Sequence, residues 1–302
     1  MSMQRLEVRI PSDGLILAGD LRIPDATHRP GPALVFTGPL TGVKEQVTGR
    51  YAAELADRGY VTLAFDHRNF GESSGSPRQH EDPSGKIRDL LDATTFLVHH
   101  PAVDPARVGS VGVCLGTSYA VNHAAIDPRV RALGLVAGAY NDPRRMRTDM
   151  GIESYRRLLL EAAHLDEAVA GGADVTYLPA VAADGGPAAM PGEEPFAYYG
   201  TDRASSPGWV NRVTQSSIRE LITLDTDAAI ALLERTPTVV VHGRTDAYCS
   251  PDRAREVADR LTGPKDLLWL DTTNHIELYD DPAFVSPAVD RLARWLDQHL
   301  GG

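Results

Sequence analysis

Short apolar runs alternate with stretches of helical periodicity along both flanks of the chain. Two strand-like runs meet at Ser12-Asp13-Gly14, a pattern typical of a β-hairpin. Further along, near-continuous apolar runs predict buried strands, and apolar positions three and four residues apart predict helices between them. The expected strands are residues 6–10, 15–23, 33–37, 60–66, 108–114, 130–138, 238–243 and 266–271; the expected helices are 45–59, 86–100, 118–126, 251–261 and 286–300.

This alternation predicts an α/β fold in which a mostly parallel sheet is covered by helices on both faces. The leading hairpin adds antiparallel strands at one edge. The pattern breaks over residues 142–235, where Arg, Ala and Gly are frequent and helical periodicity is weak. We interpret 142–235 as a helical cap inserted over the carboxyl ends of the strands, and 1–141 together with 236–302 as an α/β core.

Charge and composition narrow the classes of partner. The chain of 302 residues carries a formal charge of −11, which argues against nucleic acid and anionic membranes. The N-terminus lacks the apolar segment of a signal peptide, and no apolar run reaches the roughly 18 residues of a membrane span. We therefore expect a cytoplasmic protein whose two cysteines, Cys114 and Cys249, stay reduced.

No group of His, Cys, Asp and Glu has the spacing of metal ligands, and no glycine-rich phosphate loop stands at a strand-to-helix junction. We therefore expect neither a metal nor a cofactor.

The frame Gly112-x-Cys114-x-Gly116 lies between a predicted strand and a predicted helix. A sharp turn there exposes the central side chain, small flanking residues relieve crowding, and the helix N-terminus favours a thiolate. The alternative is a small buried core residue, which is common for free cysteine. The frame and the two residues described next favour a nucleophile.

A cysteine nucleophile needs a base and a group that orients the base. His275 follows the predicted strand 266–271, and Asp246 follows the predicted strand 238–243. The order nucleophile, acid, histidine is the order of the α/β-hydrolase triad. A lone histidine or loop aspartate is more often structural. A cysteine, an aspartate and a histidine that all follow predicted strands in this order together indicate a catalytic triad.

An acyl-transfer intermediate also needs N–H donors for its oxyanion. We expect one from the backbone of Leu115 and the other from the loop after residues 33–37, with Leu40 the first choice and Thr41 the second, because Pro39 has no N–H. Residues that could line the substrate pocket are Thr41, His67, Tyr198, Tyr199 and Trp209. The last three could instead anchor the cap to the core.

These residues resemble those of α/β-hydrolases, and more closely the bacterial dienelactone-hydrolase-like esterases related to the X-Pro peptidase clan. The similar stretches are GVKEQ (42–46), VTLAFDHRNFGESSGSPR (61–78), VGVCLGTSYAVNHAAIDPRVRAL (111–133), TPTVVVHGRTD (236–246) and NHIELYD (274–280). The resemblance covers both flanks well and the cap poorly. It implies Cys114 as nucleophile, Asp246 as acid and His275 as base.

The leading hypothesis is a hydrolase that cleaves an activated acyl bond (ester, lactone or thioester) of a small-molecule substrate, free or carrier-bound. The alternative enzyme is an acyltransferase or cyclase in natural-product biosynthesis that passes the same acyl group to an acceptor other than water. A binding protein on a hydrolase scaffold is a third hypothesis, and a redox pair of Cys114 with Cys249 a fourth. The cluster Arg144, Arg145 and Arg147 could meet an acidic substrate or carrier, although a solvated basic turn is the simpler interpretation. A homodimer formed through the cap is plausible.

Overall fold

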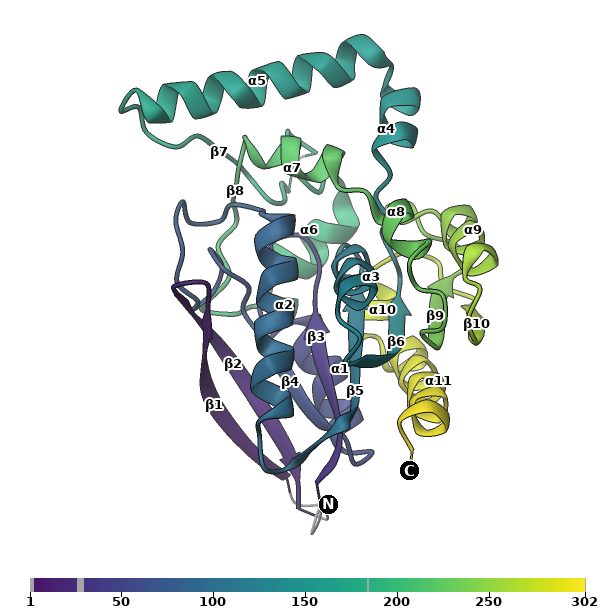
Figure 1. The fold of residues 1–302 in the computed structure, drawn as a ribbon. Helices are drawn as coiled ribbons and strands as arrows, with labels where there is room; N and C mark the ends of the chain where they lie inside the picture. Colours follow the sequence, from purple (N-terminus) through teal and green to yellow (C-terminus); the bar gives the residue numbers. More distant parts are fainter. Residues whose placement is uncertain (1–2, 26–29, 184, 302) are drawn as a thin grey trace.

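The sheet at the centre of the fold has eight strands in the order β1-β2-β4-β3-β5-β6-β9-β10 (Figure 1). The computed structural model describes residues 3–25, 30–183 and 185–301. The strands of this sheet are β1 (Met3–Ser12), β2 (Leu15–Pro24), β3 (Gly31–Thr37), β4 (Val61–Phe65), β5 (Val103–Val113), β6 (Val130–Val136), β9 (Thr238–Gly243) and β10 (Lys265–Leu270). β1 and β2 form an antiparallel hairpin, β2 pairs antiparallel with β4, and the strands from β4 to β10 pair in parallel. The mostly parallel sheet with an antiparallel N-terminal edge is confirmed.

Helices cover both faces of the sheet, as the unbroken apolar strands predict. The core helices are α1 (Val47–Ala56), α2 (Pro83–Val98), α3 (Gly116–Ile126), α9 (Pro251–Arg260), α10 (Glu277–Asp280) and α11 (Pro282–Leu300). On β3, Leu34 and Phe36 pack in the apolar cluster that holds α1 and α11, whereas Ala33 and Val35 pack in the cluster that holds α2. Successive side chains of a strand point to opposite faces, so each strand feeds two cores.

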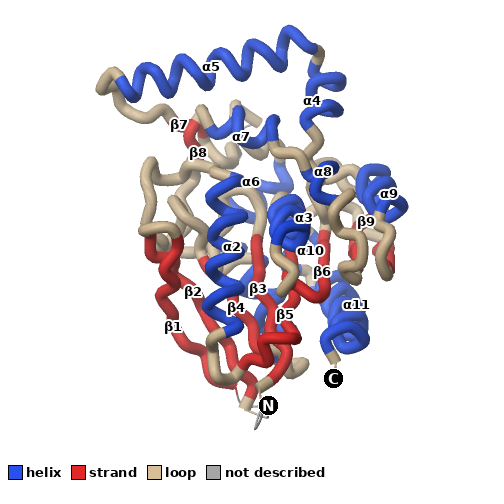
Figure 2. Tube along the Cα trace, in the orientation of Figure 1, coloured by secondary structure: helices blue, strands red, loops and turns tan. Residues whose placement is uncertain are grey.

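The segment between β6 and β9 is called the insertion here. It contains α4 (Pro143–Met150), α5 (Ile152–Ala170), β7 (Tyr177–Leu178), α6 (Glu193–Tyr199), the 3₁₀ helix η1 (Asp202–Ala204), β8 (Val213–Thr214), α7 (Ser217–Thr223) and α8 (Thr226–Ile230). β7 and β8 pair as a separate two-stranded sheet. Figure 1 shows α4, α5 and α7 beyond the ends of β3, β5 and β6, on the side where those strands lead into the loops of the site. Helices make up much of the insertion (Figure 2).

Most element boundaries differ from the expectation by no more than three residues, and two differ by more. β5 begins at Val103 instead of residue 108, and α11 begins at Pro282 instead of residue 286. The helix starts early because the side chain of Asp281 accepts a hydrogen bond from the N–H of Ala283, while Pro282 occupies the first turn, where no N–H is needed. Pro287 lies inside this helix, which hides the true start in the sequence. Among the helices of the described residues, none is long and apolar enough to cross a membrane.

Candidate active site

Cys114 occupies a sharp turn between β5 and α3. Its φ is +55°, a conformation that L-residues with side chains adopt rarely. The flanking glycines are required by close approach: a Cβ on Gly116 would lie 2.3 Å from the carbonyl oxygen of Thr37, and one on Gly112 would lie 2.5 Å from the carbonyl oxygen of Gly116. The turn thus presents the thiol at the strand end and directly before the N-terminus of α3.

His275 and Asp246 form a hydrogen-bonded pair beside this turn. The ring Nδ1 of His275 lies 2.6 Å from Oδ2 of Asp246, and both side chains are buried. Oδ1 of Asp246 accepts hydrogen bonds from the backbone N–H groups of Tyr248 and Cys249, at 2.9 and 2.7 Å. The carboxylate is therefore held by its own loop, and it in turn fixes the imidazole with Nδ1 protonated and Nε2 directed elsewhere.

Cys249 brings a second sulfur to the site. Its Sγ lies 3.9 Å from Sγ of Cys114, and both sulfurs and a ring nitrogen of His275 lie within 4.8 Å of one another. The loop that carries Asp246 therefore also brings Cys249 to the strand ends where Cys114 lies.

The protonation states of the cluster follow from these contacts. The hydrogen bond with Cys249 lowers the pKa of Cys114 well below the usual range of a thiol. Burial opposes this shift, and the His275 ring lowers the pKa of Cys114 further. Burial alone would lower the pKa of His275, but hydrogen bonds to Asp246 and Cys114 raise it to about 10. The hydrogen bond to Cys114, with burial, raises the pKa of Cys249. At neutral pH the arrangement favours a Cys114 thiolate, a His275 imidazolium and a neutral Cys249 thiol.

Tyr279 is a site residue that the sequence reasoning missed. Its hydroxyl lies 3.0 Å from Nε2 of His275, and its buried ring lies with the ring centroid 5.0 Å from that of the histidine. The four-residue spacing from His275 was the available signal, since such a pair shares one face of a helix. The sequence HIELY was not read as helical, and α10 spans only residues 277–280.

A cavity of about 350 Å³ opens above the thiol. Strand-end residues line its floor, and residues of the insertion line its walls. The lining residues are Leu40, Cys114, Leu115, Ala139, Asn141, Met146, Met150, Ala189, Met190, Pro191, Pro195, Tyr199, Ile218, Leu221, Ile222, Tyr248, Cys249, His275, Ile276 and Tyr279. Apart from the cluster around Cys114 and a few polar groups, this surface is aliphatic or aromatic.

The two expected oxyanion donors, Leu40 and Leu115, both line this cavity. Within the described residues, neither backbone N–H has an intramolecular acceptor. Thr41, the second choice, has a φ of +61°, and its hydroxyl accepts a hydrogen bond from the indole N–H of Trp209 at 3.3 Å. Its side chain is thus occupied in holding an insertion residue.

The expected pocket residues fall into two groups. Tyr199 lines the cavity, while Tyr198 and Trp209 contact its ring from outside the lining, edge-on at 4.7 Å and stacked at 5.5 Å between ring centroids. His67 is buried, with its Nε2 2.9 Å from Oγ1 of Thr37 and its Nδ1 3.3 Å from the carboxylate of Asp89. These contacts tie β3 and α2 to the loop after β4, and burial lowers the pKa of His67.

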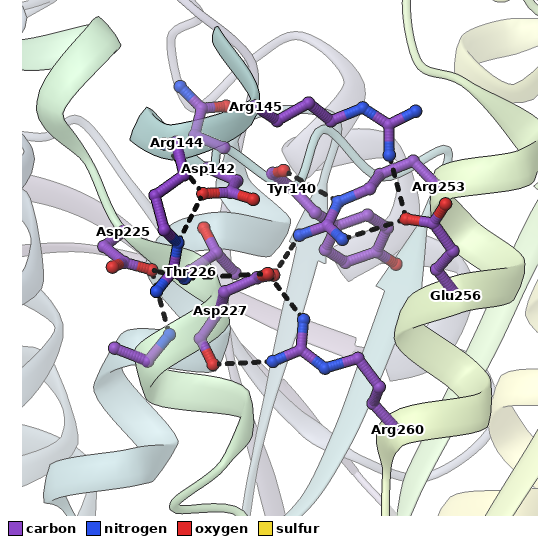
Figure 3. Close-up of polar contacts among 12 residues, drawn as sticks. Tyr140, Asp142, Arg144, Arg145, Asp225, Thr226, Asp227, Arg253, Glu256 and Arg260 are labelled. Atoms are coloured by element: carbon purple, nitrogen blue, oxygen red, sulfur yellow. Dashed lines mark hydrogen bonds and ion pairs between the residues drawn. The ribbon is translucent and has the colours of Figure 1, made fainter. Parts of the chain in front are cut away.

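Arg144 and Arg145, two of the three arginines clustered at the start of the insertion, are paired with acids. Arg144 hydrogen-bonds Asp142, and Arg145 forms an ion pair with Glu256 of α9 at 2.9 Å (Figure 3). Arg253 and Arg260 of α9 converge on Asp227 of α8 in the same network. Arg144 and Arg145 therefore join α4 to α8 and α9, whereas Arg147 is exposed and forms no ion pair among the described residues.

Among the residues that the structure describes, two groups of side chains carry potential metal ligands. One is the trio of Cys114, Cys249 and His275. The other is the trio of Glu45, Asp66 and Glu72, but Nζ of Lys44 lies 2.6, 3.1 and 2.7 Å from their oxygens. The ammonium group offsets one of the three carboxylate charges, and it gives Asp66, the buried member of the trio, the partner that a buried acid needs.

The parallel sheet, the strained turn after β5 and the acid and histidine after β9 and β10 together define an α/β-hydrolase. Residues 40–282 match the family described as serine aminopeptidase, S33, and the chain belongs to this family. The sequence-based identification as an α/β-hydrolase is confirmed.

Relatives support hydrolytic or acyl-transfer chemistry. The chain is 31 % identical to the uncharacterized protein YcjY of Escherichia coli over 89 % of each chain. It is 29 % identical to the thiohydrolase aneE of Aspergillus aculeatus, covering 96 % of this chain and 92 % of that one. It is 27 % identical to the polyketide transferase claH of Penicillium crustosum, covering 96 % and 95 %.

Solved structures share the fold along the whole chain. The hypothetical protein PA2218 of Pseudomonas aeruginosa superposes with a TM-score of 0.88 at 29 % identity, over 98 % of this chain and 94 % of that one. DcsB, solved with a substrate analogue, gives 0.85 at 23 % identity over 100 % of both chains. A dienelactone hydrolase from Anabaena variabilis gives 0.59 at 16 % identity over 98 % of both. The last two likenesses show the fold alone.

Proposed function

We propose that the protein cleaves an activated acyl bond, above all a thioester, through Cys114, His275 and Asp246. One observation carries the proposal: a low-pKa thiol stands on a strained turn beside a carboxylate-held histidine at the floor of an apolar cavity. A thiolate attacks activated acyl groups readily, and a thioester acyl-enzyme stays reactive enough to be resolved. Relatives named thiohydrolase agree with this substrate class.

The reaction would run in two halves. The Cys114 thiolate attacks the acyl carbon, and the oxyanion is held by the N–H groups of Leu115 and Leu40. The bond to the leaving group breaks as His275 gives its Nε2 proton to the departing sulfur or oxygen. In the second half His275 takes a proton from water, the hydroxide attacks the acyl-enzyme, and the acid leaves as the thiolate reforms. Asp246 keeps the imidazole in the tautomer that both halves need.

The cavity favours an apolar acyl chain. Met146, Met150, Ile218, Leu221 and Ile222 form walls with little to hydrogen-bond, so a highly polar acyl group would lose its hydration without compensation. The leaving group would face the solvent-exposed side of the cavity, which suits a thiol on a larger carrier.

Replacing the nucleophile tests the proposal. Cys114→Ala is expected to lower kcat/KM for acyl thioesters by about 10³-fold or more, because the residues of a triad act as a unit. Short- and medium-chain acyl thioesters of N-acetylcysteamine serve as substrates, with far-UV circular dichroism as the check on folding. In the wild type, intact-mass and peptide analysis after quenching should place an acyl adduct on Cys114 and none on Cys249. Retained turnover in the Ala variant, or an adduct elsewhere, refutes the proposal.

A second candidate is transfer of the acyl group to an acceptor other than water. The insertion covers the thiol with apolar side chains, and a site that excludes water protects an acyl-enzyme from hydrolysis. The relatives named polyketide transferase and acyltransferase agree with this outcome. Turnover in ¹⁸O-labelled water decides between the two candidates: label in the released acid supports hydrolysis, and unlabelled coupled product with an added alcohol or amine supports transfer.

A further inference from the structure

Cys249 forms no bond to the acyl group in the proposed chemistry, yet its sulfur is buried against the reactive thiol. The two Sγ atoms lie 3.9 Å apart, and a ring nitrogen of His275 lies within 4.8 Å of both. The three residues come from three loops, after β5, β9 and β10. Two thiols and an imidazole at these distances form the donor set that soft divalent cations prefer.

We propose that Cys114, Cys249 and His275 form a binding site for a thiophilic divalent cation, zinc above all, that excludes acyl chemistry while it is occupied. In a tetrahedral site with Zn–S bonds of about 2.3 Å, two sulfurs lie about 3.8 Å apart. The observed sulfur separation of 3.9 Å needs almost no adjustment to match that edge. Three protein ligands leave a fourth position, which opens into the cavity that the three residues line.

His275 has the second hydrogen bond, from its other ring nitrogen, that metal-bound histidines usually have. Its Nδ1 is engaged by the carboxylate of Asp246 at 2.6 Å, so Nε2 is the nitrogen left to coordinate. A carboxylate behind the imidazole fixes the ring and raises its basicity as a ligand. Nε2 now lies 3.0 Å from the hydroxyl of Tyr279, so this hydrogen bond must yield when a cation binds.

The surroundings select the cation. Apart from the two sulfurs and the imidazole, the lining is mainly aliphatic and aromatic, and it lacks the carboxylate oxygens that Ca²⁺ and Mg²⁺ need. Binding would release the remaining thiol and imidazolium protons. The cation would then be bound by Cys114 and His275 at once, so neither could act as nucleophile or base and turnover would stop.

Cobalt titration of the full reduced chain under argon tests the site directly. Wild-type protein should bind one equivalent of Co²⁺ with a thiolate-to-cobalt charge-transfer band and the ligand-field bands of a tetrahedral centre, and Zn²⁺ should abolish both bands because it binds such sites more tightly. Asp246→Asn should weaken Zn²⁺ binding by about 10–100-fold while keeping the charge-transfer band. Cys249→Ala should halve or abolish the band.

Glu72→Gln is the matched control. It alters the other trio of potential ligands, which contains Glu72 with Glu45 and Asp66, and it should leave the cobalt spectrum unchanged. Circular dichroism confirms folding, and Cys249→Ser replaces Cys249→Ala if the latter does not fold. A spectrum without thiolate charge transfer, or equal Zn²⁺ affinity in wild type and the Cys249 variant, overturns the proposal. The spectra need no turnover, so a failure of the proposed acyl chemistry would leave this result standing, and the reverse holds as well.

Discussion

Two helices of 19 residues each show how differently the two parts of the molecule are held. α11 belongs to the core and buries Val285, Ala288, Val289, Leu292, Ala293, Leu296 and Leu300. Of the residues of α5 in the insertion, all of which the structure describes, Ala162 is the one that is buried. Figure 2 shows α11 against the sheet and α5 extended across the far end of the molecule.

The difference separates two tasks. The core fixes the groups proposed to react, because the turn at Cys114 and the loops of Asp246 and His275 follow strands β5, β9 and β10 of one sheet. The insertion closes part of the cavity with Met146 and Met150 of α4, a helix that buries no residue in a segment that is fully described. A wall held by few buried contacts can adjust at low cost, which the proposed acyl site needs in order to admit and release substrate.

Truncating one leucine in each helix should give the largest contrast. Leu292→Ala in α11 removes a fully buried side chain that packs over Gly134 of β6, and should lower the free energy of unfolding by about 2–5 kcal/mol. Leu160→Ala in α5, at a side chain 56 % exposed, should change it by less than about 0.5 kcal/mol. Urea denaturation followed by tryptophan fluorescence measures both. Similar losses in the two variants would mean that α5 is buried in solution.

Two glycine substitutions extend the comparison between the core and the insertion to catalytic activity. Gly116→Ala would press a methyl group against the carbonyl oxygen of Thr37 and displace the turn, so kcat/KM should fall by about 100-fold. Gly171 lies at the end of α5 with a φ of −80°, and a Cβ there would lie 3.3 Å from the carbonyl oxygen of Ala168, so Gly171→Ala needs only a small local adjustment and should leave kcat/KM within twofold. Steady-state kinetics on folded protein is the readout, and wild-type rates in the Gly116 variant would contradict the geometry described for the turn.

A larger side chain on the insertion side of the cavity should change the selectivity for acyl chain length more than the rate of the chemical step. Met150→Trp adds bulk to the wall, and kcat/KM for long acyl thioesters should fall by about 10–200-fold, the range for a pocket that loses a methylene-sized space. The acetyl thioester should be affected little. Competition between acyl chains of different length in one reaction gives the ratio, and an equal fall for every chain length would place Met150 in the reacting geometry instead.

Titration should distinguish the buried site from an ordinary thiol. Since hydrogen bonding to Cys249 and the His275 imidazolium keep the pKa of Cys114 low, its alkylation by iodoacetamide should stay fast well below the usual thiol range. Turnover should fall as pH rises through about 10, where the imidazolium loses the proton that the leaving group needs. Removing the Cys249 thiol should move the acid limb of alkylation to higher pH. A wild-type midpoint in the ordinary thiol range would contradict the arrangement.

The smallest effect is expected where a solvent-exposed ion pair ties the insertion to α9. Arg145→Ala removes an ion pair with Glu256 in which both side chains are more than 40 % exposed, and should change the free energy of unfolding by less than about 1 kcal/mol. The effect should shrink further at 1 M salt. Thermal unfolding at two salt concentrations checks this, and a large salt-independent loss would show that the network in Figure 3 is a structural core.

Much of the fold and part of the site were predictable from local pattern alone. Apolar runs of period two and near-continuous strands fixed the order of the elements, and the glycines around Cys114 marked the turn because no larger residue fits there. The placement of Asp246 and His275 after successive late strands followed, because parallel strands end at one edge of the sheet. These features depend on near neighbours in the chain, which the sequence displays directly.

Only the tertiary structure decided what surrounds the thiol. Strand order and register set the 3.9 Å between Cys114 and Cys249, and a short helix turns Tyr279 back onto His275. His67 looked like a pocket residue, but its ring is held between Thr37 and Asp89. The apolar residues of α5 could equally have marked a core helix. Burial is a property of the whole packed chain, so no local pattern could show which apolar face the sheet would cover and which it would leave exposed.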